Sequence, residues 1–199
     1  FLNVLYEYAK GFGVSGNIVF GLMITTCTCY GYLACGPADI SLPNLSVISA
    51  LCMICLMNSL MTYYTYFKDY EGDKAAGKKT IVVKYGIENA RYIGLAASLL
   101  PMLLFIILYI YHIIPANLTQ LFWALAILTG FLQVWTGYLF YKNPVGEKTY
   151  YSLAMNFRAG ACGMAAVIGI FNENLAVILF LAAYIFVGIL FDLHGNSKA

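Results

Sequence analysis

Six apolar segments of about 20 residues each dominate the sequence. They cover residues 14–35, 45–67, 92–114, 118–141, 150–171 and 175–191. A helix of about 20 apolar residues crosses a hydrocarbon core roughly 30 Å thick. Strands are excluded, because an open sheet in lipid leaves backbone groups unsatisfied and the segments lack the alternation of a barrel. The sequence therefore predicts an all-α, polytopic transmembrane bundle with a single domain over residues 1–199.

The composition agrees with a membrane protein. Hydrophobic residues make up 62% and charged residues 10% of the chain, whereas soluble domains average about 45–50% and about 25%. Nucleic-acid binding has no support. Nearly all of the six cysteines fall inside apolar segments, so we expect reduced, packed thiols. Cys52 and Cys55 form a CxxC without a second pair, so we expect them to pack rather than bind metal.

The basic residues predict the orientation of the chain. One set of connections carries ten of the eleven Lys and Arg residues: Lys10, the six in the stretch 68–91, Lys142, Lys148 and Lys198. The alternate connections, at about 36–44, 115–116 and 172–174, carry none. Because cytoplasmic loops are rich in Lys and Arg, we expect the stretch 68–91 and the C-terminus on the cytoplasmic side of a multi-pass protein.

Arg158 is the basic residue left over, about ten residues into a predicted span. At 1.5 Å per residue it lies roughly 13–15 Å from the end of its helix. An ionisable group at that depth costs at least a few kcal/mol, so it should face the bundle interior or a wet cavity. The alternative is snorkelling toward the interface beside Asn156. The sequence leaves both interpretations open.

Residues 68–86, KDYEGDKAAGKKTIVVKYG, form the only strongly charged run. Asp69 and Asp73 are four apart, so on a helix their carboxylates point the same way, about 6 Å apart along the axis. Such a pair suits Mg²⁺, which takes one or two carboxylates and completes its shell with water and phosphate oxygens. Nearby lysines able to hold a diphosphate are Lys68, Lys74, Lys78 and Lys79. The alternative is that the lysines only fix the topology and pair with the acids.

The charged run is part of a longer pattern. Residues 64–86 read YxxFKDxEGDKxxGxxTxxVxxG, which resembles the second aspartate-rich motif of the UbiA superfamily of intramembrane prenyltransferases. The segment from Leu5-Tyr6 through Lys10 to Gly16-Asn17 also resembles a segment of that family. The specific resemblance covers about the first 86 residues.

The resemblance implies a bundle of about nine spans around a central cavity, in which two aspartate-rich motifs bind Mg²⁺ and an isoprenyl diphosphate. A prenyl group would pass to a lipophilic acceptor, such as a quinone precursor, a pigment or a glyceryl phosphate, with Mg²⁺-assisted loss of diphosphate. Asp69 and Asp73 match the second motif and would hold the metal. The diphosphate would contact Lys68, Lys74, Lys78 and Lys10. Residues expected at the substrate cavity are Tyr66, Asn17, Asn58 and Arg158.

The family's first motif, of NDxxDxxxD type, has no counterpart in these 199 residues. Its absence suggests that roughly the first third of a full-length protein, with its N-terminal helices, is missing. It also supports an alternative function, in which a non-catalytic UbiA-like membrane protein acts as a lipid carrier or assembly subunit. A small transporter has less support, because no internal repeat is evident. Amides such as Asn58 can equally serve to hydrogen-bond between helices.

Overall fold

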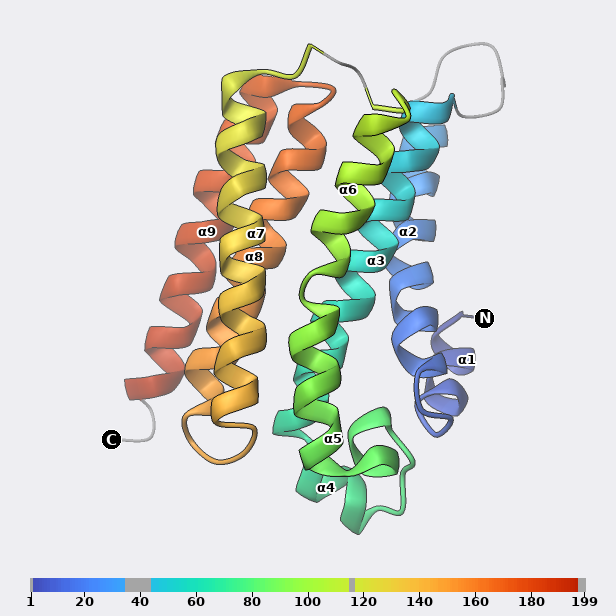
Figure 1. Cartoon of the computed structure of the whole chain (residues 1–199), viewed down its shortest axis with the longest axis vertical. Helices are drawn as coiled ribbons and strands as arrows, with labels where there is room; N and C mark the ends of the chain where they lie inside the picture. Colours follow the sequence, from blue (N-terminus) through green and yellow to red (C-terminus); the bar gives the residue numbers. More distant parts are fainter. Residues whose placement is uncertain (1, 35–43, 115–116, 197–199) are drawn as a thin grey trace.

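The computed structural model describes residues 2–34, 44–114 and 117–196, in which every regular element is a helix (Figure 1). Cys35, the loop at 36–43, residues 115–116 and Lys198, which the sequence analysis used, lie outside the described residues. The helices are α1 (Leu2–Ala9), α2 (Ser15–Ala34), α3 (Leu45–Lys68), α4 (Tyr70–Ala75), α5 (Ile81–Ala97), α6 (Leu100–Ile110), α7 (Gln120–Lys142), α8 (Thr149–Gly169) and α9 (Glu173–Asn196).

Five stretches of the described chain are long and apolar enough to cross a membrane. They are α2, α3, the α5–α6 pair (Ile81–Ile110), α7 and residues Glu173–Phe191 of α9. The protein is therefore a multi-pass, all-helical membrane protein, as the sequence predicts. Helix α8 lies where the fifth of the six spans, residues 150–171, is expected and has 21 residues, but it packs between α3, α7 and α9. Its surroundings are largely protein rather than lipid, which allows it to carry Asn156 and Arg158.

The segment expected to span the membrane as one helix from residue 92 begins earlier and is broken. Helix α5 starts at Ile81 and passes a kink at Gly86, whose φ of +75° is readily reached only by glycine. It ends before Ser98, and α6 starts with Pro101 in its first turn. Proline lacks a backbone N–H and its ring clashes with the carbonyl four residues earlier, so the helix is interrupted there.

Helix α3 holds the bundle together, packing against α2, α5, α6 and α8 (Figure 1). Two neighbouring tyrosines dock α5 onto it. The hydroxyl of Tyr63 donates to the carbonyl of Ala90 (2.5 Å) and that of Tyr64 to the carbonyl of Gly94 (2.7 Å). On the α8 side, Asn156 Nδ2 donates to the carbonyl of Met61 (2.9 Å). These bonds fix the register of three long helices where hydrophobicity alone cannot, because lipid is as apolar as the side chains.

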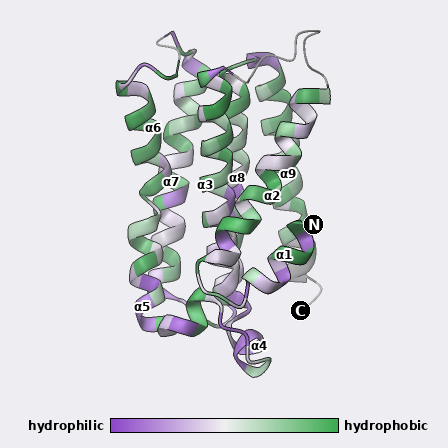
Figure 2. Ribbon diagram, turned by 90° about the vertical axis from the view of Figure 1, so that its right-hand side faces the viewer, coloured by the Kyte–Doolittle hydropathy of each residue, from purple (hydrophilic) through white to green (hydrophobic). Residues whose placement is uncertain are grey.

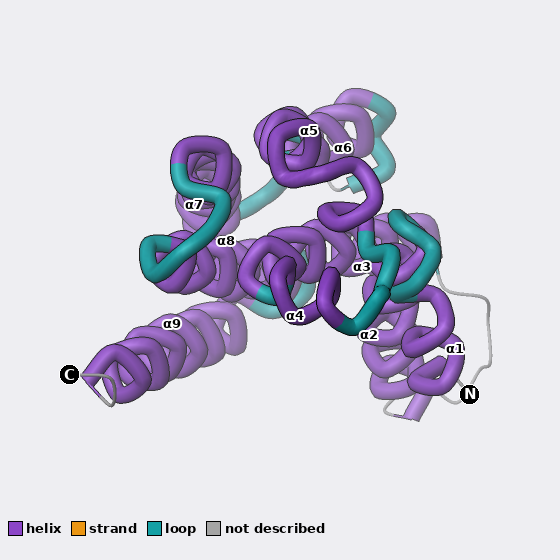
Figure 3. Tube along the Cα trace, turned by 90° about the horizontal axis from the view of Figure 1, so that it is seen from below, coloured by secondary structure: helices purple, strands orange, loops and turns teal. Residues whose placement is uncertain are grey.

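Polar residues gather at one end of the bundle, which we call the α4 end (Figure 2). The stretch 68–91, expected to be a loop, contains α4 and the first part of α5 at this end. Seen from below, α4 lies beneath the bundle, near the connection between α1 and α2 (Figure 3). The helix bodies are mainly hydrophobic (Figure 2). Many large apolar side chains of α6 and α9 are exposed, as lipid contact requires, and polar exposed residues such as Glu173 lie at the start of α9.

Candidate functional site

The two predicted metal ligands lie where α3 passes into α4. Asp69 follows the last residue of α3, and the backbone N–H of Asp73 donates to the Asp69 carbonyl (2.8 Å). The chain therefore keeps its helical course, and the two carboxylates are one turn apart, as the spacing predicts. Their surroundings differ, because Asp69 is exposed whereas only 5% of Asp73 is exposed.

Two lysines contact the carboxylate of Asp73, and both contact the same oxygen atom. Lys10 Nζ lies 3.4 Å and Lys78 Nζ 3.8 Å from its Oδ1 atom. Its other oxygen, Oδ2, is buried and has no hydrogen-bond partner among the described residues. Buried carboxylate oxygens are nearly always paired, so Oδ2 is a place where a further donor or a cation would bind.

The backbone explains how Lys10 reaches Asp73 across 63 positions of sequence. After α1 the chain turns, and the N–H of Gly13 donates to the carbonyl of Lys79 (3.0 Å). Gly13 also forms an isolated parallel bridge with Thr80, and its φ of +68° favours glycine. This contact ties the α1–α2 connection to the α4–α5 connection. It thereby brings Lys10 and Lys78 to the same carboxylate.

Tyr66 forms an aromatic wall of this site. Its ring is 1% exposed, and the Lys10 ammonium lies 5.4 Å from the ring centroid, a cation–π distance. Gly16 makes the approach possible. A Cβ at this position would lie 2.7 Å from the Tyr66 hydroxyl oxygen and 2.8 Å from Lys10 Cα. The start of α2 can therefore come this close to α3 only with glycine at position 16.

Asn17 extends the polar surface toward the middle of the bundle. Its Nδ2 donates to the carbonyl of Ser59 (3.3 Å), while its Oδ1 is buried without a hydrogen-bond partner in the described chain. Ser59 precedes Tyr66 by seven residues, so Asn17 lies about 10 Å farther from the α4 end. A site that begins at Asp73 thus has a polar group deeper in the bundle, on the same side of α3.

The structure does not bring the other predicted residues to Asp73. Lys68 lies over the ring of Tyr150 (4.8 Å) and Lys74 over that of Tyr70 (5.6 Å). Their predicted contacts with a diphosphate stay predictions, since both are exposed and long enough to reorient.

Asn58 and Arg158 lie deeper in the bundle. Asn58, on α3, faces α8 and α9, and Arg158, on α8, faces α9. Asn58 Nδ2 donates to the carbonyl of Ile54 within α3 (2.8 Å), and Asn58 lines a cavity between α3, α8 and α9. Arg158 stacks on Tyr184 of α9 (5.3 Å), with Nε buried and unpaired in the described chain. Their assignment to the substrate cavity also stays a prediction.

Thr80 is a residue of the site that sequence reasoning did not single out. It is fully buried beside the Gly13 bridge, and its Oγ1 has no hydrogen-bond partner in the described chain. Thr80 belongs to the recognised pattern, but spacing alone gives no reason to place its side chain inside. The same holds for Gly16, whose role depends on a contact between two helices.

A magnesium ion fits the carboxylates that the structure presents. Asp69 and Asp73 offer hard oxygen ligands one turn apart, and Asp73 Oδ2 is free to coordinate. In the described residues no group of three or more His, Cys, Asp or Glu side chains could hold a metal ion. The pair therefore fits an ion that keeps several waters and gains phosphate oxygens, as Mg²⁺ does, and not a closed protein cage.

Comparison with known sequences decides the family. Residues 1–158 match the UbiA prenyltransferase family. The chain belongs to this family. The predicted family and the all-helical fold are thereby confirmed, and the match includes Lys10, Tyr66, Asp69, Asp73 and Lys78 of this UbiA-family chain.

One curated relative gives a comparison with an individual protein of known name. The chain is 28% identical over 151 residues to digeranylgeranylglyceryl phosphate synthase of Thermococcus sibiricus, an alignment that covers 71% of this chain and 47% of that protein. The chain thus spans about half the length of the curated relative that it matches. No solved structure matches it significantly.

Proposed function

We propose that this UbiA-family protein transfers a prenyl group from an isoprenyl diphosphate to a lipophilic acceptor. The observation that carries the proposal is the surroundings of Asp73. A buried carboxylate with two lysines on one oxygen and the other oxygen free lies at the end of an apolar bundle. This arrangement suits a metal-bound diphosphate joined to a hydrophobic chain, because it offers charge at the end of the bundle and apolar surface beyond it.

The lysines account for binding and departure of the diphosphate. Lys10 and Lys78 can direct N–H donors to its oxygens, and the exposed Lys68 and Lys74 can close over it. When the bond between prenyl C1 and oxygen breaks, the electron pair stays on the diphosphate and its negative charge grows. Cations placed there stabilise this transition state more than the bound ground state. Magnesium, held by Asp69 and Asp73, would supply further positive charge to the diphosphate.

Tyr66 and the apolar helix surface account for the prenyl group. The positive charge that develops on the allylic carbons is attracted by the face of an aromatic ring, and Tyr66 lies beside Lys10. An apolar wall also excludes water, which would otherwise capture the carbon. The acceptor then forms the new bond to C1 with its own electron pair and releases its proton, which leaves with the diphosphate.

The acceptor class follows from the relative. Digeranylgeranylglyceryl phosphate synthase is named for a glyceryl phosphate product, which favours a glyceryl phosphate lipid over a quinone precursor or a pigment. The orientation follows from the loop charges. The α4 end carries Lys10, Lys78 and Lys142, so this end, with the diphosphate site, would face the cytoplasm.

Binding of a non-cleavable donor tests the proposal. Isothermal titration of the protein in nanodiscs with geranylgeranyl thiolodiphosphate should show binding that requires Mg²⁺. Asp73→Asn should weaken it at least about tenfold, because one charged ligand removed from a metal site costs on the order of 1.4 kcal/mol or more. Glu71→Gln, an exposed neighbour, is the matched control and should bind as the wild type does. Mg²⁺-independent binding, or none, would overturn the proposal and agree with a lipid carrier without catalytic activity.

A further inference from the structure

A cavity of about 270 Å³ lies where α3 and α9 both pack against α8. We call it the α8–α9 cavity and define it by two lining residues from each helix: Asn58 and Met61, Ala161 and Met164, and Leu179 and Ala183. None of the described residues that line it is ionisable. Because an apolar cavity of roughly 150 Å³ can hold benzene, this one has room for on the order of ten carbon atoms.

The cavity lies on the side of α3 that carries Asp69. Met61, Thr65 and Asp69 follow one another at intervals of four residues, and the backbone N–H of Asp69 donates to the carbonyl of Thr65 (3.3 Å). Residues at this spacing lie one above another on a continuous helix. Asp69 is eight residues beyond Met61, so the cavity begins about 12 Å from this predicted metal ligand.

Lys68 and Tyr150 lie at the end of this path that is nearer α4. The Lys68 ammonium lies 4.8 Å from the centroid of the Tyr150 ring, so the two residues join α3 and α8 there. Tyr150 precedes Phe157, which lines the cavity, by seven positions and therefore shares its face of α8. The facing surfaces of α3 and α8 thus run from a lysine at the α4 end to an apolar cavity. They suit a molecule with an anionic head and an apolar chain.

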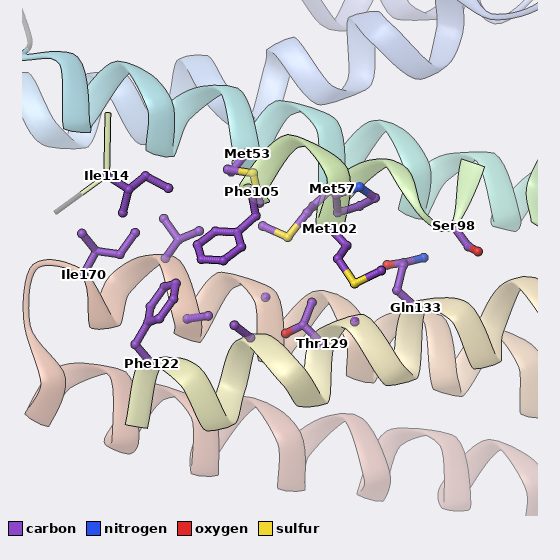
Figure 4. A pocket seen from close by; sticks show the side chains of 16 residues that line it. Met53, Met57, Ser98, Met102, Phe105, Ile114, Phe122, Thr129, Gln133 and Ile170 are labelled. Atoms are coloured by element: carbon purple, nitrogen blue, oxygen red, sulfur yellow. The ribbon is translucent and has the colours of Figure 1, made fainter. Parts of the chain in front are cut away.

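A smaller cavity, of about 70 Å³, lies on the other side of Met57, between α3, α6, α7 and α8 (Figure 4). The rings of Phe105 and Phe122, 5.4 Å apart between centroids, bridge α6 and α7 beside it. Tyr64 shares its helix face with Met57 and is bonded to α5, so it lies between this cavity and the α4 end. A chain that begins at Asp69 therefore reaches the α8–α9 cavity and not the smaller one.

The distances indicate which chain would fill the α8–α9 cavity. An extended chain advances roughly 3.5 Å for every three bonds, so about ten bonds lead from a diphosphate beside Asp69 to the level of Met61. At this rate a geranyl group ends short of the cavity and a farnesyl group only enters it. A geranylgeranyl group would place about its last two prenyl units inside, which agrees with room for on the order of ten carbon atoms.

Helix α9 forms the outer wall of the cavity. Its Leu179 and Ala183 line the cavity, and both lie beyond residues 1–158, which match the family. The rings of Phe157 and Phe191 pack together, 5.8 Å apart between centroids, and hold α9 against α8. The wall that limits the space for a chain is therefore supplied by a helix outside the family match.

We propose that the α8–α9 cavity binds the distal part of the donor's prenyl chain, and that Leu179 and Ala183 make geranylgeranyl the preferred length. The diphosphate stays at the site around Asp73, while the chain runs between α3 and α8. Met61 and Met164 suit this role, because unbranched methionine side chains adapt to a flexible ligand. The inference rests on the proposed prenyl transfer and adds a donor length to it.

Photolabelling of the wild-type chain in nanodiscs with Mg²⁺ locates the end of the prenyl chain. A geranylgeranyl thiolodiphosphate with a diazirine on its last unit should label α8 and α9, at Met164 and Leu179. The geranyl analogue with the same group at its end should instead label α3 near Thr65. Labelling of α6 and α7 by the longer probe, or the same labelled residues for both probes, would overturn the inference.

Calorimetry with the unmodified thiolodiphosphates tests the chain length. Ala183→Phe places a ring in the cavity and should weaken Mg²⁺-dependent binding of the geranylgeranyl analogue at least about fivefold, as overpacking does elsewhere. Ala161→Leu, on the α8 side of the cavity, should act in the same way. Binding of the geranyl analogue should stay within about twofold, since its chain ends before the cavity. Partition of each analogue into the nanodisc lipid is the same for every variant.

Ala182→Phe is the matched control, because Ala182 is exposed on the same helix and is not among the described residues that line the cavity. It should bind both analogues as the wild type does, and binding of the geranyl analogue shows that a variant is folded with its diphosphate site intact. Unchanged geranylgeranyl binding in folded Ala183→Phe and Ala161→Leu, or equal weakening in Ala182→Phe, would show that the chain lies elsewhere. If the wild type bound neither analogue with Mg²⁺, the proposed prenyl transfer itself would be wrong.

Discussion

The ammonium group of Lys10 lies 3.4 Å from Oδ1 of Asp73 and 5.4 Å from the centre of the Tyr66 ring. The lysine is 14% exposed and the carboxylate 6%, so the pair is largely removed from water. Breaking a buried pair by removing one partner is costly. The same geometry means that Lys10 competes with a metal ion for Asp73. When a diphosphate binds, the Lys10 ammonium would turn from Asp73 toward it.

Substituting Lys10 should therefore have opposite effects on two ligands. In Lys10→Met, the loss of the competing charge should raise the affinity for Mn²⁺ alone by about threefold to tenfold, which corresponds to roughly 0.7–1.4 kcal/mol. The affinity for the Mg²⁺–diphosphate analogue should fall by at least a similar factor, because a charged donor to the diphosphate is lost. Electron paramagnetic resonance of free Mn²⁺ and calorimetry measure the two.

Lys142→Met gives the matched control for this experiment. Lys142 is exposed at the end of α7, so the substitution changes the net charge equally but away from Asp73. Both affinities should stay within about twofold of the wild type, as expected for an exposed, screened charge. If Lys10→Met moved both affinities in the same direction, a switch of Lys10 between carboxylate and diphosphate would be wrong.

Two glycines of α2 should respond oppositely to alanine. In Gly16→Ala the new methyl group would lie under 3 Å from the Tyr66 hydroxyl and from Lys10 Cα, so the helices must move apart. We expect a loss of about 1–3 kcal/mol in the free energy of unfolding, the usual cost of overpacking. In Gly31→Ala, where nothing lies within 4 Å, helix propensity should stabilise the protein by about 0.5–1 kcal/mol.

Unfolding in mixed micelles with increasing dodecyl sulfate measures both glycine variants. Diphosphate binding provides a second readout, because Gly16→Ala should also displace Lys10 whereas Gly31→Ala should not. Equal stabilities for the two variants would contradict the close contact between the start of α2 and α3.

The sequence predicted the helical bundle and the family because both depend on patterns that are local in the chain. Long apolar segments admit only helices in lipid, and the string around Asp69 and Asp73 is contiguous. The interruption between α5 and α6 is not predicted, although the pair still forms one candidate span, Ile81–Ile110. Pro101 was visible there, but a proline kinks some membrane helices and ends others, depending on what the neighbouring helices offer the freed backbone groups.

The partners of Asp73 could not be read from the sequence in the same way. The four lysines assigned to the diphosphate included Lys10 and Lys78, but spacing did not separate them from Lys68 and Lys74. The distinction comes from the Gly13–Lys79 hydrogen bond, which joins two connections far apart in the chain.

The tyrosine pair of α3 should contribute measurably to stability. Tyr63→Phe and Tyr64→Phe each leave a backbone carbonyl of α5 without its tyrosine donor. Because hydrogen bonds between membrane helices average about 0.6 kcal/mol with a maximum near 1.7, we expect each variant to lose an amount in this range. Unfolding in mixed micelles measures it. Tyr30→Phe, at a side chain 75% exposed, is the control and should change nothing; no loss in either inner variant would contradict the docking of α5 through these hydroxyls.

The orientation of the bundle can be tested at the two ends of the long helices. Single cysteines at Lys142→Cys and Asn172→Cys, both at exposed positions, lie at opposite ends of the bundle, where α7 ends and where α8 passes into α9. The background is a chain whose own cysteines are replaced by alanine. Because the α4 end carries the lysines, the positive-inside rule places residue 142 in the cytoplasm and residue 172 outside. A membrane-impermeant maleimide added to intact cells should label Asn172→Cys but not Lys142→Cys. After the cells are permeabilised, it should label both variants. The reverse pattern would put Asp73 and its lysines on the outer surface, away from a cytoplasmic supply of prenyl diphosphate.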